Sequence, residues 1–215
     1  MLKVYGRKSA FHVQKAMWFV GELGIAHELV EVGGPAGGLD APDFRKMNPH
    51  GRIPVLDDGG TIVWESHTIL RYLAARHGAR KYWSDDPAKR TMAERWMDWA
   101  QTALQPDFVR GVFWAFYRTP EDRRDMAAVQ RKVAQCGNHF KLLDGILEGR
   151  NYLLGDELSL ADIPAGTNLY RYFNIDIDRP HVPNVERWFS ALQERPAFRE
   201  HVMVPFDELF GRPAD

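Results

Sequence analysis

The stretch Asn48-Pro-His-Gly-Arg-Ile-Pro-Val-Leu-Asp-Asp-Gly-Gly-Thr-Ile-Val-Trp-Glu-Ser66 decides the fold of this chain of 215 residues. It contains two short apolar runs, residues 53–56 and 61–64, separated by Asp-Asp-Gly-Gly. Two such runs around a turn of Asp and Gly predict a β-hairpin. Glu65 and Ser66 then stand between the hairpin and a helical pattern that should end near Gly78.

Upstream of the hairpin the pattern alternates between strand and helix. Leu2-Lys-Val-Tyr5 and Leu29-Val-Glu-Val32 are strand-like, and apolar positions at helical spacing run from Val13 to a plausible stop at Gly24. The glycine-rich residues 33–38 must form a loop. The order strand, helix, strand, loop, strand, strand, helix predicts a small α/β unit with a mixed sheet.

Beyond residue 80 the strand signals vanish. We therefore expect a domain over residues 1–80, a linker at 81–86 and an all-helical domain over 87–215. In the helical domain, Thr119 should cap a helix that starts at Pro120. The helical patterns cover residues 88–117, 120–148, 160–173 and 184–194.

Composition excludes several functional classes. The 28 Lys and Arg residues balance 29 Asp and Glu residues, so the formal net charge is -1 and nucleic acid is not an expected partner. No apolar run reaches the roughly 20 residues of a membrane-spanning helix, and the N-terminus lacks the apolar core of a signal peptide. The single cysteine, Cys136, excludes an internal disulfide and a cysteine-based zinc finger. We expect a cytoplasmic protein without a metal.

Three segments carry candidate chemistry. Pro54 has no N–H to donate to a strand ladder, which leaves two alternatives. It is an ordinary trans proline that starts an edge strand, as base rates favour, or the Ile53–Pro54 bond is cis and presents the Ile53 backbone to a ligand. Glu65 and Ser66 stand at a helix N-terminus, where an anion can dock, although Ser66 would equally serve as a helix cap. Ser9 precedes the first helix and has the same two readings.

Together these segments resemble the cytosolic glutathione transferases, specifically a bacterial, theta/beta/nu-like branch. The resemblance rests on the order and spacing of four motifs and covers essentially the whole chain. The bacterial branch rests on residues 12–24, which begin His-Val-Gln-Lys where that branch commonly has Asn-Val-Gln-Lys. It implies a thioredoxin-like domain of four mixed strands and helices, followed by an all-helical C-terminal domain. The motifs are Asn48-Pro-His-Gly-Arg-Ile-Pro-Val-Leu56, Trp64-Glu-Ser66, Ile69-Leu-Arg-Tyr-Leu73 and Leu158-Ser-Leu-Ala-Asp-Ile163.

The resemblance also implies roles for site residues. Pro54 is similar to the family's cis-proline, which leaves the Ile53 backbone to pair with the cysteinyl part of glutathione. Glu65 and Ser66 correspond to the pair that binds the γ-glutamyl amine and carboxylate. Near the glycine carboxylate, the resemblance places two further residues, Arg52 and His50. It further implies a homodimer.

At the positions that would activate the glutathione thiol, this sequence differs from the branch that it resembles. Ala10 and Phe11 replace a usual polar pair, and His12 replaces an Asn. Ser9 is the only hydroxyl in this connection and is our candidate for stabilising the thiolate, with His12 as the runner-up. If neither acts, the backbone N–H groups or Lys8 must do so.

The implied activity is a glutathione transferase that uses glutathione as co-substrate. Its thiolate would attack a small apolar electrophile in a pocket between the domains, for which Phe11 and Phe113 are candidate lining residues. The alternative for these aromatic residues is core packing. Two other functions stay open: a non-catalytic protein that binds glutathione or apolar ligands, and a glutathione-dependent peroxidase or isomerase.

Overall fold

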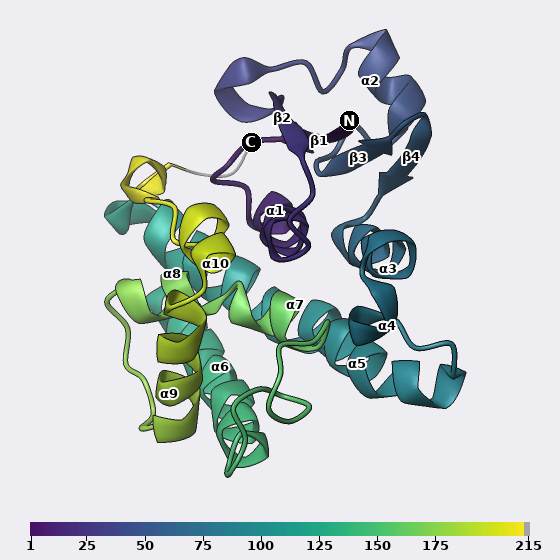
Figure 1. Cartoon of the computed structure of the whole chain (residues 1–215). Coiled ribbons are helices and arrows are strands. Elements are labelled where there is room, and N and C mark those ends of the chain that lie inside the picture. The colour runs from purple at the N-terminus through teal and green to yellow at the C-terminus, as the bar shows by residue number, and fades with distance from the viewer. Residues whose placement is uncertain (213–215) are drawn as a thin grey trace. The chain divides into compact units, whose positions relative to one another are not determined.

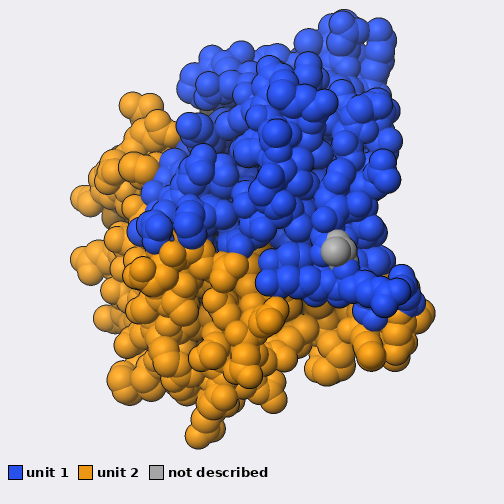
Figure 2. Space-filling view, in the orientation of Figure 1, with its two compact units in different colours: residues 1–85, 196–204 blue, residues 86–195, 205–215 orange. Residues whose placement is uncertain are grey.

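The computed structural model describes residues 1–212 and divides the chain into two compact units. Unit 1 comprises Met1–Asp85 and Pro196–Val204, and unit 2 comprises Asp86–Arg195 and the residues from Pro205 onward (Figure 2). Unit 1 gives way to unit 2 between Asp85 and Asp86, which both lie within residues 81–86. Residues 196–204, which the sequence pattern assigned to the helical domain, belong instead to unit 1.

Unit 1 is built on a four-stranded mixed sheet in the order β2-β1-β3-β4 (Figure 1). β1 pairs in parallel with β2, whereas β1 with β3 and β3 with β4 are antiparallel. The predicted hairpin is therefore confirmed as β3 and β4, joined by Gly59 and Gly60 at φ of 62° and 98°. The strands are β1 (Leu2–Gly6), β2 (His27–Glu31), β3 (Val55–Asp58) and β4 (Thr61–Trp64).

Helices α1 (Phe11–Glu22) and α3 (Ser66–His77) lie on one side of the sheet, and α2 (Pro42–Met47) lies on the other (Figure 1). α1 packs against α3 and also against α10 (Pro196–His201). It is therefore buried on most of its circumference. A Cβ at Gly6 would collide with the side chain of Val13, so this glycine permits the close approach of β1 and α1. Short helices at Gly34–Ala36 and α4 (Ala79–Tyr82) complete the unit.

Unit 2 is helical, as predicted. The expected first helix consists of α5 (Pro87–Trp99) and two π-helical segments, Ala100–Leu104 and Pro106–Arg118. The remaining elements are short helices at Glu121–Arg123 and Asp207–Leu209, with α6 (Met126–Ile146), α7 (Asp162–Gly166), α8 (Leu169–Asn174) and α9 (Pro183–Gln193). α6 packs along Pro106–Arg118 and carries the buried Cys136.

One helix start in unit 2 was wrongly predicted. α6 begins at Met126, where the carboxylate of Asp125 accepts a hydrogen bond of 2.9 Å from the Ala128 N–H. The hydroxyl of Thr119 instead donates to the carbonyl of Trp114, and Pro120 precedes only a short 3-10 turn. Both sites carry a residue type that caps helices, and an aspartate cap is at least as favourable as a threonine cap.

In the motif Leu158-Ser-Leu-Ala-Asp-Ile163, Ser159 and Asp162 form hydrogen bonds typical of a capping box. The Asp162 carboxylate accepts hydrogen bonds from the Ser159 N–H and the Ser159 hydroxyl, at 2.9 and 2.7 Å. Its other oxygen accepts from the N–H of Leu153 at 2.9 Å. Asp162 thus ties the start of α7 to the preceding loop.

Candidate functional site

The loop before β3 presents the backbone of Ile53. Asn48 organises this loop, because its side-chain amide donates to the Arg52 carbonyl at 2.8 Å and its side-chain oxygen accepts from the His50 N–H at 3.1 Å. The Ile53–Pro54 peptide bond is cis, as the family resemblance implied and against the base rate. The β1–β3 ladder ends at the pair of Tyr5 and Val55, so Ile53 lies just outside it.

Glu65 stands immediately before α3 in a strained backbone conformation. Its φ of 68° and ψ of 116° are costly for any residue with a Cβ, and such strain concentrates at functional sites. The Glu65 side chain is exposed, whereas Ser66 is buried as the first residue of α3. Ser66 is therefore not the helix cap that the simpler reading proposed. An exposed carboxylate beside a helix N-terminus has the chemistry to bind a ligand that carries both an ammonium and a carboxylate group.

Of the residues predicted to stabilise the thiolate, His12 lies beside Ser66, at the junction between β4 and α3. It is exposed in the first turn of α1, and its Nδ1 lies 3.4 Å from the Ser66 hydroxyl oxygen. Ser9 is half-buried in the turn between β1 and α1, where Ala10 rather than Ser9 holds the N-cap position. The contact between His12 and Ser66 joins the two helix N-termini that border the site.

Two residues that the sequence analysis missed lie beneath this junction. Lys15 is fully buried, with its Nζ 3.3 Å from His12 Nδ1 and 3.2 Å from His67 Nε2. Burial lowers the pKa of Lys15 well below its usual range, and Glu65 opposes this shift. Burial, and then the positive charge of Lys15, lower the pKa of His67 to about 2, so His67 is neutral.

A sequence signal for Lys15 existed. Residues 16–20 of α1 are Ala-Met-Trp-Phe-Val, a run of apolar residues that leaves no polar face at this point of the helix. A helix that is apolar all round is buried. A lysine directly before such a run is therefore a candidate for a buried, functional ammonium or amine.

Arg52 and His50 are both exposed in the loop that leads to Pro54, next to the hairpin. The His50 ring meets the Trp64 ring edge to face, with centroids 5.3 Å apart. This places His50 against the last residue of β4, directly before Glu65. Their assignment to the glycine carboxylate stays a prediction.

The two aromatic candidates lie in different units. Phe11 is buried at the start of α1, with its ring centroid 5.7 Å from that of His12 and 5.2 Å from Lys15 Nζ. Phe113, in unit 2, is buried with its ring stacked on Tyr117 at 5.3 Å and under the Arg171 guanidinium at 4.7 Å. A role of either ring in binding substrate stays a prediction.

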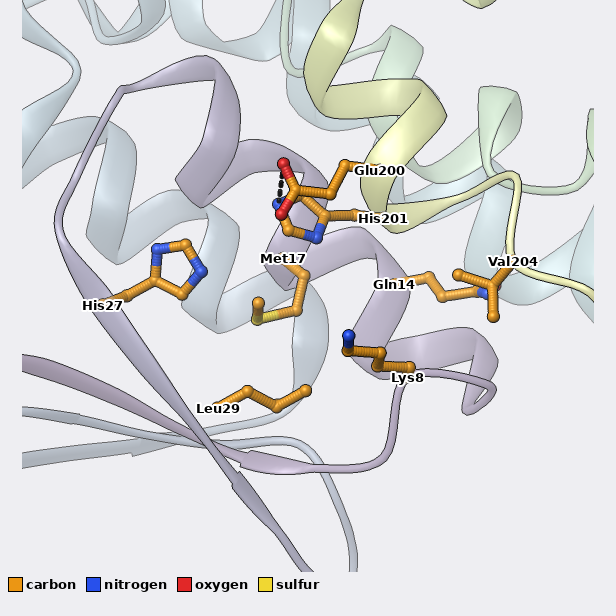
Figure 3. Close-up of a pocket in the computed structure, with 8 residues that line it drawn as sticks. All are labelled: Lys8, Gln14, Met17, His27, Leu29, Glu200, His201 and Val204. Atoms are coloured by element: carbon orange, nitrogen blue, oxygen red, sulfur yellow. Dashed lines mark ion pairs between the residues drawn. The ribbon is translucent and has the colours of Figure 1, made fainter.

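Lys8 lines a separate cavity of about 200 Å³ on the other side of α1 (Figure 3). This cavity is bordered by α1, β2 and α10, including Met17, Leu29 and His201. Lys15 and His12, three residues apart, occupy the helix face toward α3, whereas Gln14 and Met17 occupy the opposite face. The geometry therefore places His12, and not Lys8, beside Ser66.

Within residues 1–212, no helix is both long enough and apolar enough to span a membrane. In the same part of the chain, no group of three or more His, Cys, Asp or Glu residues is arranged to hold a metal ion.

Comparison with known proteins identifies relatives over nearly the full chain. The profile of the glutathione S-transferase N-terminal domain matches residues 4–81, and that of the C-terminal domain matches residues 107–196. The chain is 38% identical to glutathione S-transferase GstB of Escherichia coli, over 95% of this chain and 99% of that protein. It is 30% identical to glutathione S-transferase 3 of Zea mays, over 94% and 93% of the two chains. The theta class glutathione S-transferase of Xanthomonas axonopodis pv. citri, solved with glutathione bound, superposes with a TM-score of 0.88 at 38% identity, over 95% of this chain and 98% of that one.

Proposed function

The chain belongs to the glutathione S-transferase family, and from this premise we propose that it transfers glutathione to a small apolar electrophile. In this reaction the glutathione thiol loses its proton, and the sulfur forms a bond to an electrophilic carbon. Where that carbon carries a leaving group, the group departs with the bonding electron pair. The observation that carries the proposal is the junction of Glu65, Ser66 and His12 at the N-termini of α3 and α1.

The residues of unit 1 match the chemistry of glutathione from end to end. The exposed Glu65 carboxylate suits the γ-glutamyl ammonium, and the N-terminus of α3 with the Ser66 hydroxyl suits the neighbouring carboxylate. The Ile53 backbone, outside the ladder, suits the cysteinyl amide. We propose Arg52 and His50 as partners for the glycine carboxylate, since both side chains are exposed in the loop that contains Ile53.

Activation of the thiol needs a donor, because a free thiol has a pKa of about 8.5 and is mostly protonated at neutral pH. A hydroxyl or an imidazole N–H that donates to sulfur stabilises the anion. Ser9 and His12 are the two side chains we assign to this role. Neighbouring N–H groups at the start of α1 add positive potential near the sulfur.

The finer assignments follow from family membership. We propose that the protein is cytoplasmic and forms a homodimer, and we keep Phe11 and Phe113 as candidates for contact with the apolar electrophile. Light scattering tests the homodimer, since a dimer has twice the 24.7 kDa mass of the chain.

A turnover assay tests the proposal directly. Purified protein is incubated with glutathione and, separately, with an aryl halide, an α,β-unsaturated carbonyl compound and an organic hydroperoxide. We expect a thioether product from at least one of the first two electrophiles. Disulfide formation with the hydroperoxide alone would identify a peroxidase. Calorimetric binding of glutathione without product from any of the three compounds would exclude the transferase and peroxidase readings for these substrates and favour the non-catalytic or the isomerase reading.

A further inference from the structure

Lys15 is the group at the site whose burial has the least obvious reason. It comes from α1, is fully buried, and lies between two imidazoles, one on α1 and one on α3. Burying an amine costs free energy unless its hydrogen bonds are satisfied, and replacing it with an apolar side chain is often stabilising. A purely structural role would be served better by methionine. The lysine therefore calls for an explanation from the site above it.

Lys15 has enough N–H groups to donate to His12 in either protonation state. A neutral lysine amine has two N–H donors and one lone pair, and a protonated one has three donors. Whichever role Lys15 takes toward His67, it keeps at least one N–H for Nδ1 of His12, 3.3 Å away. A His12 that accepts at Nδ1 carries its proton on Nε2 when the ring is neutral.

The ring of His12 is thereby turned in a defined direction. Its Nδ1 faces Lys15 and the Ser66 hydroxyl, at 3.3 and 3.4 Å. Nε2 stands across the imidazole from Nδ1, so it is directed away from this buried cluster. His12 as a whole is exposed, which gives a ligand access to the ring.

We propose that Lys15 is a positioning residue that acts through His12: it fixes the orientation and the Nε2–H tautomer of the imidazole, which then donates to the glutathione thiolate. The inference rests on the proposed function. It makes His12, rather than Ser9, the principal donor to the sulfur. It also explains why Lys15 lies on α1, the helix that carries His12. It further explains why Lys15 contacts His67, the residue next to Ser66, at 3.2 Å.

Two measurements test the proposal. The first is ¹⁵N NMR of the histidine side chains of the wild-type protein, with the His12 signal assigned by its loss in His12→Ala. We expect the Nε2–H tautomer with a hydrogen-bonded Nδ1, and a changed Nδ1 shift in Lys15→Met. An Nδ1–H tautomer in the wild-type protein overturns the proposal. This measurement needs no turnover, so its outcome is separate from that of the proposed function.

The second measurement is a double-mutant cycle of Lys15→Met and His12→Ala. Its readouts are kcat/KM and the pKa of the bound thiol, followed by ultraviolet absorbance of the thiolate. We expect Lys15→Met to fold, to lower kcat/KM about 10- to 100-fold and to raise the thiol pKa, because a misplaced donor loses much of its effect. The double variant should match His12→Ala alone, since Lys15 has no route to the sulfur without His12.

Lys3→Met, which removes an exposed lysine of β1, serves as the control for loss of positive charge and should leave both readouts unchanged. A wild-type thiol pKa in Lys15→Met, or effects that multiply in the double variant, overturns the proposal. Should Lys15→Met fail to fold, Lys15→Gln retains an N–H donor on a side chain one bond shorter and is expected to raise the thiol pKa less than His12→Ala does. A thiol pKa raised in folded Lys15→Gln as far as in His12→Ala, with an unchanged His12 tautomer, counts against positioning through the hydrogen bond.

Discussion

The indole ring of Trp18 and the phenyl ring of Phe198 meet edge to face in the core of unit 1, with centroids 4.8 Å apart. Trp18 belongs to α1 and Phe198 to α10, so a helix from near the C-terminus covers the helix that carries His12 and Lys15. Both rings are fully buried. The contact therefore makes the last part of the chain a structural component of the unit that holds the candidate glutathione site.

Replacing Phe198 with alanine should destabilise the protein by about 3–5 kcal/mol, the usual cost of removing a buried aromatic ring. Urea unfolding followed by tryptophan fluorescence measures this loss. Phe210→Ala is the control, because Phe210 is 53% exposed and its removal should cost far less. A loss in Phe198→Ala as small as that expected for Phe210→Ala would show that α10 contributes little to the stability of unit 1.

Glu65 allows strain and binding to be separated. Glu65→Ala keeps the unfavourable φ of 68° and removes the carboxylate, whereas Glu65→Gly removes both the carboxylate and the strain. We expect both variants to bind glutathione about 1.5–3 kcal/mol more weakly, through loss of a charged hydrogen bond. Glu65→Gly should nevertheless be about 1 kcal/mol more stable to urea than Glu65→Ala.

Calorimetry measures the affinities of these two variants, with Glu31→Ala as the control for removal of an exposed carboxylate from unit 1. Unchanged glutathione affinity in both Glu65 variants would remove Glu65 from the binding site. Equal stability of the two would mean that the backbone strain is relieved elsewhere.

The two candidate thiol donors predict different variant behaviour. We expect His12→Ala to raise the pKa of bound glutathione thiol and to lower turnover about 10²–10³-fold, the usual effect of a lost donor to a developing anion. Ser9→Ala should have the smaller effect, because Ser9 lies in the turn before α1 and His12 contacts Ser66 at 3.4 Å. Ultraviolet titration of the bound thiolate measures both. A larger change of the thiol pKa in Ser9→Ala than in His12→Ala would mean that the Ser9 hydroxyl is the principal donor to the sulfur.

Asp162 should make stability depend on pH. Burial raises the pKa of its carboxyl from 3.8 to about 6 in the folded protein, and hydrogen bonds from Leu153 and Ser159 oppose this shift. Because the folded pKa exceeds the unfolded one, the folded chain binds the proton more tightly. The contribution of Asp162 is therefore full below pH 4 and is lost as the pH rises through about 6.

The loss amounts to about 3 kcal/mol between these limits, at 1.36 kcal/mol for each pKa unit. Urea unfolding at pH 4, 5, 6 and 7 should show a weaker pH dependence in Asp162→Asn than in the wild-type protein. The exposed Asp176 provides the matched control, Asp176→Asn, which should leave the dependence unchanged. An unaltered slope in Asp162→Asn would contradict the assignment.

The sequence by itself determined the features that depend on neighbours along the chain. The hairpin of β3 and β4 follows from two apolar runs around Asp-Asp-Gly-Gly, since a turn of that composition favours only a few local geometries. The candidate site residues of unit 1 were also chosen from short motifs, through the family resemblance, and their roles stay predictions. Arg52, Ile53 and Pro54 precede one strand, Glu65 and Ser66 stand at the start of one helix, and each group lies within a short contiguous motif.

Only the tertiary structure decided which helices pack together and what lies between them. The contact of Lys15 with His67 joins residues 52 positions apart, and α10 reaches unit 1 from the other end of the chain. Periodicity predicts that a helix buries one face, but the identity of the covering element depends on packing among distant segments. Thr119 and Asp125 show the same limit within one region, because either residue can cap a helix and the packing of α6 on Pro106–Arg118 fixes where that helix begins.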